Sequence, residues 1–521
     1  MNEKSAVEDI YLCIKSKVNR QWVIAFVSCF IIGLLTYGYL MTNHFLTYDS
    51  MWNLYSDQDM ITSGRQFLTY ACAFSSYYDF PFLNGILAIL YLAVTSVLLV
   101  ELFQIKNGIS GVLISGLLVT FPSVISTFCY TFTVDGYMLA VLLVTAALLI
   151  TERRKFGFIW GAVLLGISLG IYQAYLAFLM VLCVIMLLLQ ILDERNVKKI
   201  VIQLGRYAGM GVGGYAFYLI TLNMMLKLKG QTLSGYQGSD KVNSFSLSTL
   251  PAGLKTAFQS FIDFARWGNV FTTTEVMKVV FVVLMLAGAG MYAYLFLIKK
   301  CYTKPWKILL GALLTISIPI CATIINVLSP DTYYHLLMRG AWCLLFIFVV
   351  VLAEKMSPYQ KMWEGRIKRA VAAIVFVSSA VLIFEFTKMA NVVGFNMEER
   401  YEKNYALTLR IVESLEETPG YHHGMKVAIL GGEPNDSIFP STEITTTDLV
   451  GYFGVQGDYS LNSTEKFAVF MKHYMNVTIE VIGYEEEIAL TQSGEFLEMP
   501  YFPYSGCIRQ IGDVWVVKLN G

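Results

Sequence analysis

Long runs of apolar residues, separated by short polar segments, occupy most of the chain before residue 389. A membrane-spanning helix needs about 20 mostly apolar residues. We expect spans at 21–41, 82–103, 109–128, 135–151, 156–172, 173–192, 206–226, 276–298, 307–328, 337–353 and 369–388. The continuous run from 156 to 192 is divided near Gly170 into a hairpin. The pattern predicts a polytopic α-helical membrane protein with about eleven transmembrane helices.

Three polar segments are too long to be turns between these spans: 42–81, 227–275 and 389–521. The second contains an amphipathic stretch at 250–267. The third carries charges throughout, and its patterns predict a polar-faced helix and short strands. These elements lie at 396–417, 426–430, 477–484 and 514–519. We therefore expect a transmembrane domain at 1–388, with outer loops 42–81 and 227–275, and a small α/β domain at 389–521.

The distribution of cations predicts the orientation, because cytoplasmic loops of membrane proteins are enriched in Lys and Arg. With a cytoplasmic N-terminus and a retained first helix, the cytoplasmic segments hold most of the cations. These are Lys4, Lys15, Lys17, Arg20, Lys106, Arg153, Arg154, Lys155, Arg195, Lys198, Lys199, Arg206, Lys299, Lys300, Lys304, Lys307, Lys355, Lys361, Arg366, Lys368 and Arg369. The short loops on the other side are almost bare, with Arg65 and Arg339 as exceptions. The C-terminal domain is then extracytoplasmic.

Composition excludes several functional classes. The chain of 521 residues is 56% hydrophobic and 15% charged, well below the roughly 25% charged residues of soluble domains. Lys+Arg and Asp+Glu both total 38, which argues against a nucleic-acid binder. No Walker A or G-x-G-x-x-G follows a predicted strand, so an ATP-driven machine is unsupported. Nine cysteines without a C-x-x-C pair give no disulfide or zinc framework.

Polar side chains gather in the first outer loop and at the outer ends of the spans. Asp49, Asp57 and Asp59 could take a proton from an acceptor hydroxyl or hold a divalent cation such as Mg²⁺ or Mn²⁺. The sequence leaves a metal site unknown. Arg65 and Arg339 could bind a lipid-linked phosphate through paired hydrogen bonds. The alternative is that all five are solvated loop charges, helix caps or snorkelling side chains.

Other candidate binding residues occur at the outer ends of predicted spans. Asp135 could bind sugar hydroxyls or cap a helix. Tyr172, Gln173 and Tyr175, at the turn of the expected hairpin, could form a platform for a sugar, or belong to the interfacial aromatic belt. Weaker candidates are Asp79, Asn84, His44 and His335.

Three regions in order resemble the GtrII-type glucosyltransferase family: ITSGRQFL and YDFPFLNGILAILYLA within 61–103, FTVDGYMLA at 132–140, and SLGIYQAYL at 168–176. The resemblance implies a GT-C-type enzyme of the bacterial cytoplasmic membrane. Such enzymes take a sugar, typically glucose, from undecaprenyl phosphate or a related polyprenyl phosphate. They transfer it at the outer face to O-antigen or another cell-surface glycopolymer. The expected partners are therefore a polyprenyl-phosphate-linked sugar donor, a glycopolymer acceptor and the lipid bilayer, with no nucleic acid.

In that class an acidic residue of the first outer loop is the general base, and Asp49 matches this position best. The family often shows two adjacent acids there, whereas Ser50 follows Asp49 here. Inversion at the anomeric carbon needs one base, because a phosphate leaving group needs little acid help. Two alternatives stay open. A flippase or transporter of lipid-linked sugars predicts an internal repeat, which is not visible. A polysaccharide polymerase shares the topology and would differ in its product.

Overall fold

The chain folds into two compact units in the computed structural model. The structure describes residues 16, 18–45, 47, 49–193, 196–234, 250–266, 274–328, 334–356, 362–431 and 461–519. The helical unit comprises Met1–Asn43 and Ser56–Asn391, and the C-terminal unit comprises His44–Tyr55 and Val392–Gly521. The predicted outer loop 42–81 is therefore divided, because its first part groups with the C-terminal unit.

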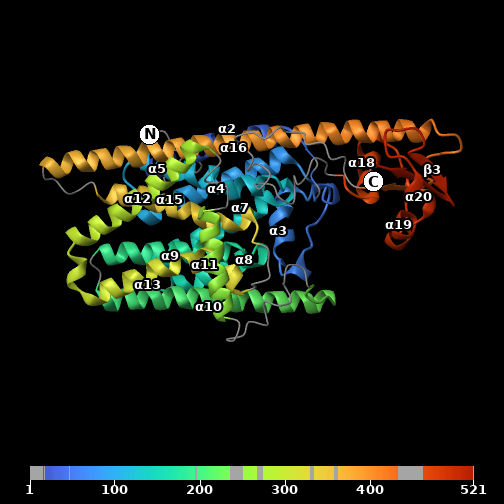
Figure 1. Cartoon of the computed structure of the whole chain (residues 1–521). Helices are drawn as coiled ribbons and strands as arrows, with labels where there is room; N and C mark the ends of the chain where they lie inside the picture. Colours follow the sequence, from blue (N-terminus) through green and yellow to red (C-terminus); the bar gives the residue numbers. More distant parts are fainter. Residues whose placement is uncertain are drawn as a thin grey trace, which may run out of the picture. The chain divides into compact units, whose positions relative to one another are not determined.

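The helical unit is a bundle of apolar helices (Figure 1). Over the described residues, nine are long and apolar enough to cross a membrane. They are α2 (Arg20–Thr42), α4 (Pro81–Phe103), α7 (Thr131–Arg153), α9 (Tyr175–Leu192), α10 (Val197–Lys229), α12 (Glu275–Ile298), α13 (Pro305–Ala322), η7 with α15 (Leu336–Trp342 and Cys343–Lys355), and α16 (Met362–Glu416). A tenth is the bent pair α5 (Gly108–Thr120) and α6 (Pro122–Phe128), and α8 (Gly157–Ile171) is a shorter apolar helix. Each expected span coincides with one of these helices, which confirms a polytopic helical membrane protein.

Breaks between helices follow local sequence. The bend of 47° between α5 and α6 occurs at Phe121, whose extended backbone precedes Pro122. The residue before a proline is disfavoured in the helical region. The expected hairpin is confirmed, since α8 ends at Ile171 and α9 begins at Tyr175. One expectation is wrong: 369–388 and 396–417 are not separate helices but one helix of 55 residues, because no proline interrupts the run.

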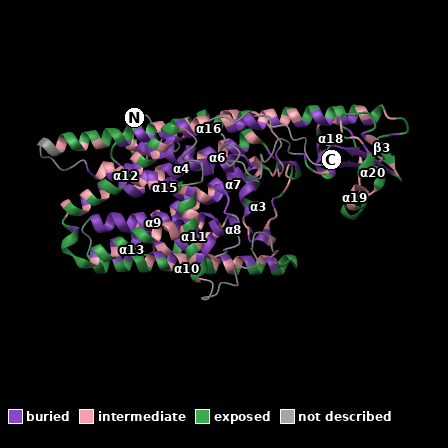
Figure 2. Cartoon of the chain, viewed as in Figure 1, coloured by how far each residue is buried: buried purple, intermediate pink, exposed green. Residues whose placement is uncertain are grey.

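Burial separates central from peripheral helices. Figure 2 shows α9 buried along its length, whereas much of α10 is exposed; 83% and 28% of their apolar windows are buried. Glycines allow α8 and α10 to approach closely. A Cβ on Gly214 would lie 2.7 Å from Leu165, and one on Gly166 would lie 2.9 Å from the carbonyl oxygen of Gly214. Small residues at such contacts are typical of helix packing in membranes.

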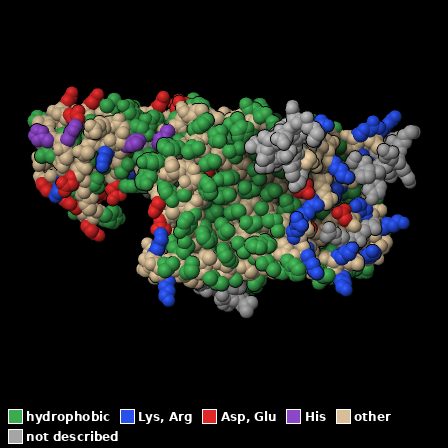
Figure 3. Space-filling view, turned by 180° about the vertical axis from the view of Figure 1, so that it is seen from behind, with side chains coloured by type: hydrophobic (Ala, Val, Ile, Leu, Met, Phe, Trp, Pro, Cys, Tyr) green, Lys and Arg blue, Asp and Glu red, His purple; other side chains and the backbone are tan. Residues whose placement is uncertain are grey.

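The two ends of the bundle differ in charge. Because successive helices alternate in direction, Thr42, Pro81, Thr131, Tyr175 and Lys229 share one end, which we call the Arg65 end. The opposite end, the cation end, holds much of the positive charge seen in Figure 3. Its cations include Lys106, Arg153, Arg154, Lys155, Lys198, Lys199, Lys299, Lys300, Lys304 and Lys355.

The C-terminal unit contains a four-stranded sheet of order β2-β1-β4-β3. The strands are β1 (Lys426–Leu430), β2 (Glu480–Val481), β3 (Ile508–Ile511) and β4 (Val514–Lys518). β1 is parallel to β2 and β4, and β3 and β4 form a hairpin whose turn contains Gly512 at φ 63°. Two of the expected strands, 426–430 and 514–519, are confirmed. The third, at 477–484, is mostly wrong: only two residues pair, and α19 (Tyr484–Thr491) starts there with three glutamates in its first turn, a favourable position for negative charge.

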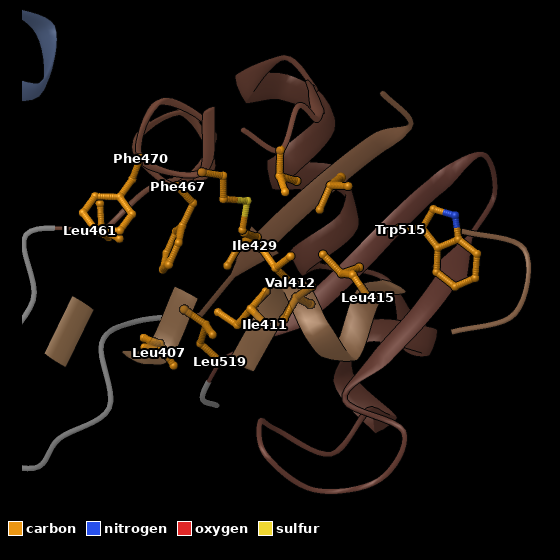
Figure 4. Close-up of a cluster of buried hydrophobic side chains, with 14 of the residues drawn as sticks. Leu407, Ile411, Val412, Leu415, Ile429, Leu461, Phe467, Phe470, Trp515 and Leu519 are labelled. Carbon is orange, nitrogen blue, oxygen red and sulfur yellow. The ribbon is translucent and has the colours of Figure 1, made fainter. Parts of the chain in front are cut away.

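A hydrophobic core joins the sheet to two helices (Figure 4). Leu407, Ile411 and Leu415 recur at the four-residue spacing of one face of α16. They pack with Phe467 and Phe470 of α18 (Thr464–Met475) and with residues of β1 and β4. Met51, from the segment His44–Tyr55, belongs to the same core and is 3% exposed. The unit is thus a small α/β region, as the sequence predicts.

Candidate functional site

A tight turn at the Arg65 end positions Arg65. The turn follows η2 (Ile61–Ser63), and Gly64 occupies the left-handed region at φ 76°. The Gln173 side-chain amide donates to the carbonyl oxygens of Ser63 (3.1 Å) and Gly64 (2.8 Å). A Cβ at Gly64 would lie 2.5 Å from the hydroxyl oxygen of Tyr218 and 2.6 Å from the amide nitrogen of Gln173. Both the backbone angle and the space therefore require glycine.

Residues after Arg65 tie the turn to the bundle. The Phe67 backbone N–H donates to the carbonyl oxygen of Gly170 at the end of α8 (2.8 Å). The buried Gln66 amide donates to the carbonyl oxygen of Tyr218 and to the hydroxyl of Thr221 on α10, both at 3.2 Å. The turn is thus anchored to two helices by hydrogen bonds on both sides of Arg65.

The Arg65 guanidinium lies on tyrosines. Its carbon is 4.8 Å from the ring centroid of Tyr172, and Nη1 donates to the hydroxyl of Tyr137 (3.2 Å). The rings of Tyr137 and Tyr172 are stacked at 4.4 Å, and Tyr175 meets Tyr172 edge-on at 5.6 Å. Stacking on an aromatic face orients the planar guanidinium fork that recognises phosphate.

Arg339 has a similar environment. Its guanidinium carbon lies 4.7 Å from the ring of Tyr334 and 4.6 Å from that of Phe264. It donates to the carbonyl oxygen and hydroxyl of Ser260 on α11 (Leu250–Arg266) at 3.2 and 3.3 Å. Leu337 and Gly340, on the same short helix η7 as Arg339, line one cavity together with Tyr175. The structure therefore gathers Arg65, Tyr137, Tyr172, Tyr334 and Arg339 at one end of the bundle, and we call this set the tyrosine–arginine cluster.

Asp135 lies near the start of α7 but outside this cluster. Its side chain is fully buried, facing Ser75 and Cys72. Among the described residues, neither carboxylate oxygen has a hydrogen-bond partner of normal geometry. An ionised carboxylate that is buried without a partner is costly. A helix-capping role therefore does not explain why the Asp135 side chain is buried.

Asp79 and Asn84 link α4 to α7. The Thr131 hydroxyl donates to the carboxylate of Asp79 (2.5 Å), and the Asn84 amide donates to the carbonyl oxygen of Thr131 (2.9 Å). These bonds hold the first residue of α7 and favour a structural role for both side chains.

Asp57 and Asp59 lie in the turn before Gly64. Asp59 forms an ion pair with Lys229 at the end of α10 (2.5 Å), and its backbone N–H donates to the carboxylate of Asp57 (3.2 Å). Asp57 is exposed and Asp59 partly exposed. The pair can therefore reach solvent.

Asp49 belongs to the C-terminal unit, where it precedes η1 (Ser50–Trp52). Burial raises the pKa of its carboxyl above the usual range, and the nearby Lys466 ammonium on α18 lowers it. Burial in turn lowers the pKa of Lys466 to about 8, while Asp49 and Glu465 raise it. The asparagine side chain of Asn53 donates to the backbone carbonyl oxygen of Asp49 (2.8 Å).

The structure adds residues that the sequence does not single out. Tyr137 is two residues from Asp135, Tyr334 directly precedes His335, and Gly64 directly precedes Arg65 in a turn-prone Ser-Gly pair. Lys466 gives no signal in the sequence. Across the residues that the structure describes, no group of three or more His, Cys, Asp and Glu side chains could hold a metal ion.

Comparison with known proteins gives a family. Residues 38–338, more than half of the chain, match the family described as Glucosyl transferase GtrII. No curated protein and no solved structure matches the chain. The matched region contains Arg65, Asp135 and Tyr172, and it ends at Met338, one residue before Arg339. The chain belongs to the GtrII glucosyltransferase family and is a multi-pass membrane glycosyltransferase.

Proposed function

We propose that this protein transfers glucose from a polyprenyl-phosphate carrier to a glycopolymer at the outer face of the bacterial cytoplasmic membrane, with inversion. The observation that carries this proposal is the tyrosine–arginine cluster. It presents two guanidinium groups, each held against aromatic rings, at one end of an apolar helical bundle.

The cluster suits a lipid-linked phosphate. Guanidinium groups bind phosphate oxygens with paired, charge-assisted hydrogen bonds. When the bond between sugar and phosphate breaks, negative charge grows on the phosphate, and fixed cations stabilise that charge. Arg65 and Arg339 supply these cations, while the isoprenoid tail lies among the helices. Tyr172, whose ring carries the Arg65 guanidinium, and Tyr175 stand beside the position we assign to the sugar.

The acceptor side needs one base. Asp49 removes the proton from the acceptor hydroxyl, which then attacks the anomeric carbon. Asp57 and Asp59 hold hydroxyls of the acceptor, and Asp135 and Gln173 complete the binding region, Gln173 by fixing the turn at Gly64. This division assigns the donor to the helical unit and the activation of the acceptor to Asp49.

The outer location is supported by the distribution of charge. Lys and Arg concentrate in the loops of the cation end, which the positive-inside rule places in the cytoplasm. The Arg65 end and the C-terminal unit then lie outside. Cysteine labelling of Asp57→Cys, an exposed position of the same loop, with a membrane-impermeant reagent in intact cells tests this; reaction only after lysis would contradict it.

A donor assay tests the reaction itself. Membranes containing the protein are incubated with polyprenyl-phosphate glucose, mannose and galactose, and consumption of each lipid is followed. We expect glucose to be transferred as a single side-branch sugar. An altered polymer chain length would favour a polymerase, and movement of the lipid between leaflets without transfer would favour a flippase.

Variants at the cluster make the assay specific. Arg65→Ala and Arg339→Ala should weaken donor use, whereas Arg369→Ala, an exposed arginine at the cation end, should not. Equal donor use by all three variants would remove the cluster from the donor site.

A further inference from the structure

The segment His44–Tyr55 is built into the core of the C-terminal unit. Met51 is 3% exposed and packs in the same cluster as Ile411 and Phe467. The ring of Phe45 lies 6.3 Å from that of Tyr401. Thr47 and Ser50 are both 2% exposed, and the Thr47 backbone N–H donates to the Ser50 hydroxyl (2.7 Å). The backbone on both sides of Asp49 is thus fixed by buried contacts.

Lys466 is the unusual side chain beside this segment. It lies on α18, which packs against η1, and it is 2% exposed. A lysine is almost never buried to this degree unless it is paired. Its ammonium group is close enough to interact electrostatically with Asp49, which is half-buried at the start of η1, and with Glu465, which is exposed on the same helix. The remaining lysine of α18, Lys472, is exposed.

We infer that the C-terminal unit takes part in sugar transfer, with Lys466 as the positioning residue that keeps Asp49 ionised and therefore able to act as a base. This inference rests on the proposed role of Asp49. Burial alone would favour the protonated carboxyl, which cannot accept a proton from the acceptor. A neighbouring ammonium group stabilises the carboxylate form and offsets that effect.

Sugar transfer should depend on pH through Asp49. A general base works only when it is ionised, so transfer should rise as the pH rises through the pKa of Asp49. Removing the Lys466 charge while keeping the length of the side chain, as in Lys466→Met, takes away the group that lowers that pKa. The acidic limb of the pH–rate profile should then move up by about 1 pH unit. Below the limb, the rate at a given pH should fall about tenfold.

The experiment uses the full-length protein purified in nanodiscs. Transfer of labelled glucose from polyprenyl-phosphate glucose to polymer is followed from pH 5 to 9, using membranes of a strain that lacks the gene as acceptor. Lys466→Met should shift the acidic limb upward without changing KM for the donor lipid. Lys466→Arg, which keeps the charge, should restore the profile, and Lys472→Met should match the wild type. An unshifted limb in Lys466→Met would overturn the inference.

A second readout separates this inference from the proposed base role. Carbodiimides react with protonated carboxyls, so modification of the Asp49 peptide against pH, measured by mass spectrometry, reports its protonation without any acceptor. The midpoint should move upward in Lys466→Met and stay in place in Lys472→Met. An unmoved midpoint would contradict the role of Lys466, whereas full activity of Asp49→Asn would contradict the proposed function alone. Thermal unfolding of each variant identifies any that has simply lost its fold.

Discussion

Asp49 and Arg65 come from the same polar segment of the sequence, yet they are held in different ways. Arg65 follows a backbone turn that Gly64 and the Gln173 amide fix within the helical unit. Asp49 precedes a short helix whose Met51 is buried in the core of the C-terminal unit. The donor-binding role that we propose for Arg65 therefore depends on contacts within the helical unit, and the base role of Asp49 depends on the core of the C-terminal unit. Variants of one region should therefore leave the other function measurable.

The largest effect is expected from Asp49→Asn. The amide fills the same space but cannot accept the proton, and a positioned general base contributes about 10²–10⁴-fold. Glucose transfer at saturating donor should fall about 1000-fold, while KM for the donor lipid stays near the wild-type value. The control is Glu413→Gln, an exposed acid on α16, which should keep most activity. Wild-type turnover by Asp49→Asn would contradict the division of roles.

Arg65→Ala should affect both kinetic constants. A hydrogen bond to a charged group contributes about 1.5–3 kcal/mol, so kcat/KM for the donor should fall roughly 10- to 150-fold. KM should rise because a phosphate contact is lost, and kcat should fall because the same cation stabilises the leaving phosphate. Arg65→Lys should recover part of the loss, since an ammonium cannot reproduce the planar fork. Titration of the donor lipid at fixed acceptor measures both. If Arg65→Ala changed only the pH dependence of transfer, Arg65 would act on the general base rather than on the donor.

The bundle could be predicted from the sequence because a bilayer demands long apolar helices. Each expected span, including the hairpin between α8 and α9, corresponds to a helix. The continuity of α16 was not predicted, since the change from apolar to polar residues near 389 marks a change of environment rather than an end of the helix. The strand expected at 477–484 failed because tertiary contacts, not local pattern, select the two residues that pair.

The candidate site was predictable only in part. Arg65 and Arg339 could be selected because cations are rare in the short loops of that side, but Tyr334 joins them only through packing. Lys466 lies more than 400 residues after Asp49, and no local pattern connects two positions so far apart. The grouping of His44–Tyr55 with the C-terminal unit likewise depends on long-range burial of Met51.

Met51→Ala should act on the C-terminal unit. Truncating a buried methionine costs about 2–5 kcal/mol through lost burial and the cavity that remains. The free energy of unfolding of this unit should fall by the same amount. Hydrogen exchange of the backbone amides of α18 and β4 measures it. Donor KM should be unchanged, because the turn at Gly64 is held by Gln173 and by α10, which both belong to the helical unit. Altered donor KM with normal exchange protection would show that the segment serves the donor side instead.

The smallest effect is expected from the ion pair between Asp59 and Lys229. The carboxylate and the ammonium approach to 2.5 Å, but the two side chains are 28% and 45% exposed. Water and salt screen such a pair, and exposed pairs contribute only about 0–1 kcal/mol. Lys229→Met should therefore change transfer by less than about threefold, and the difference should disappear in 0.5 M salt. Since Lys229 pairs with Asp59 in the turn that leads to Gly64, a loss as large as that of Arg65→Ala would mean that this surface contact, rather than Gln173 and the glycine, fixes the position of the guanidinium.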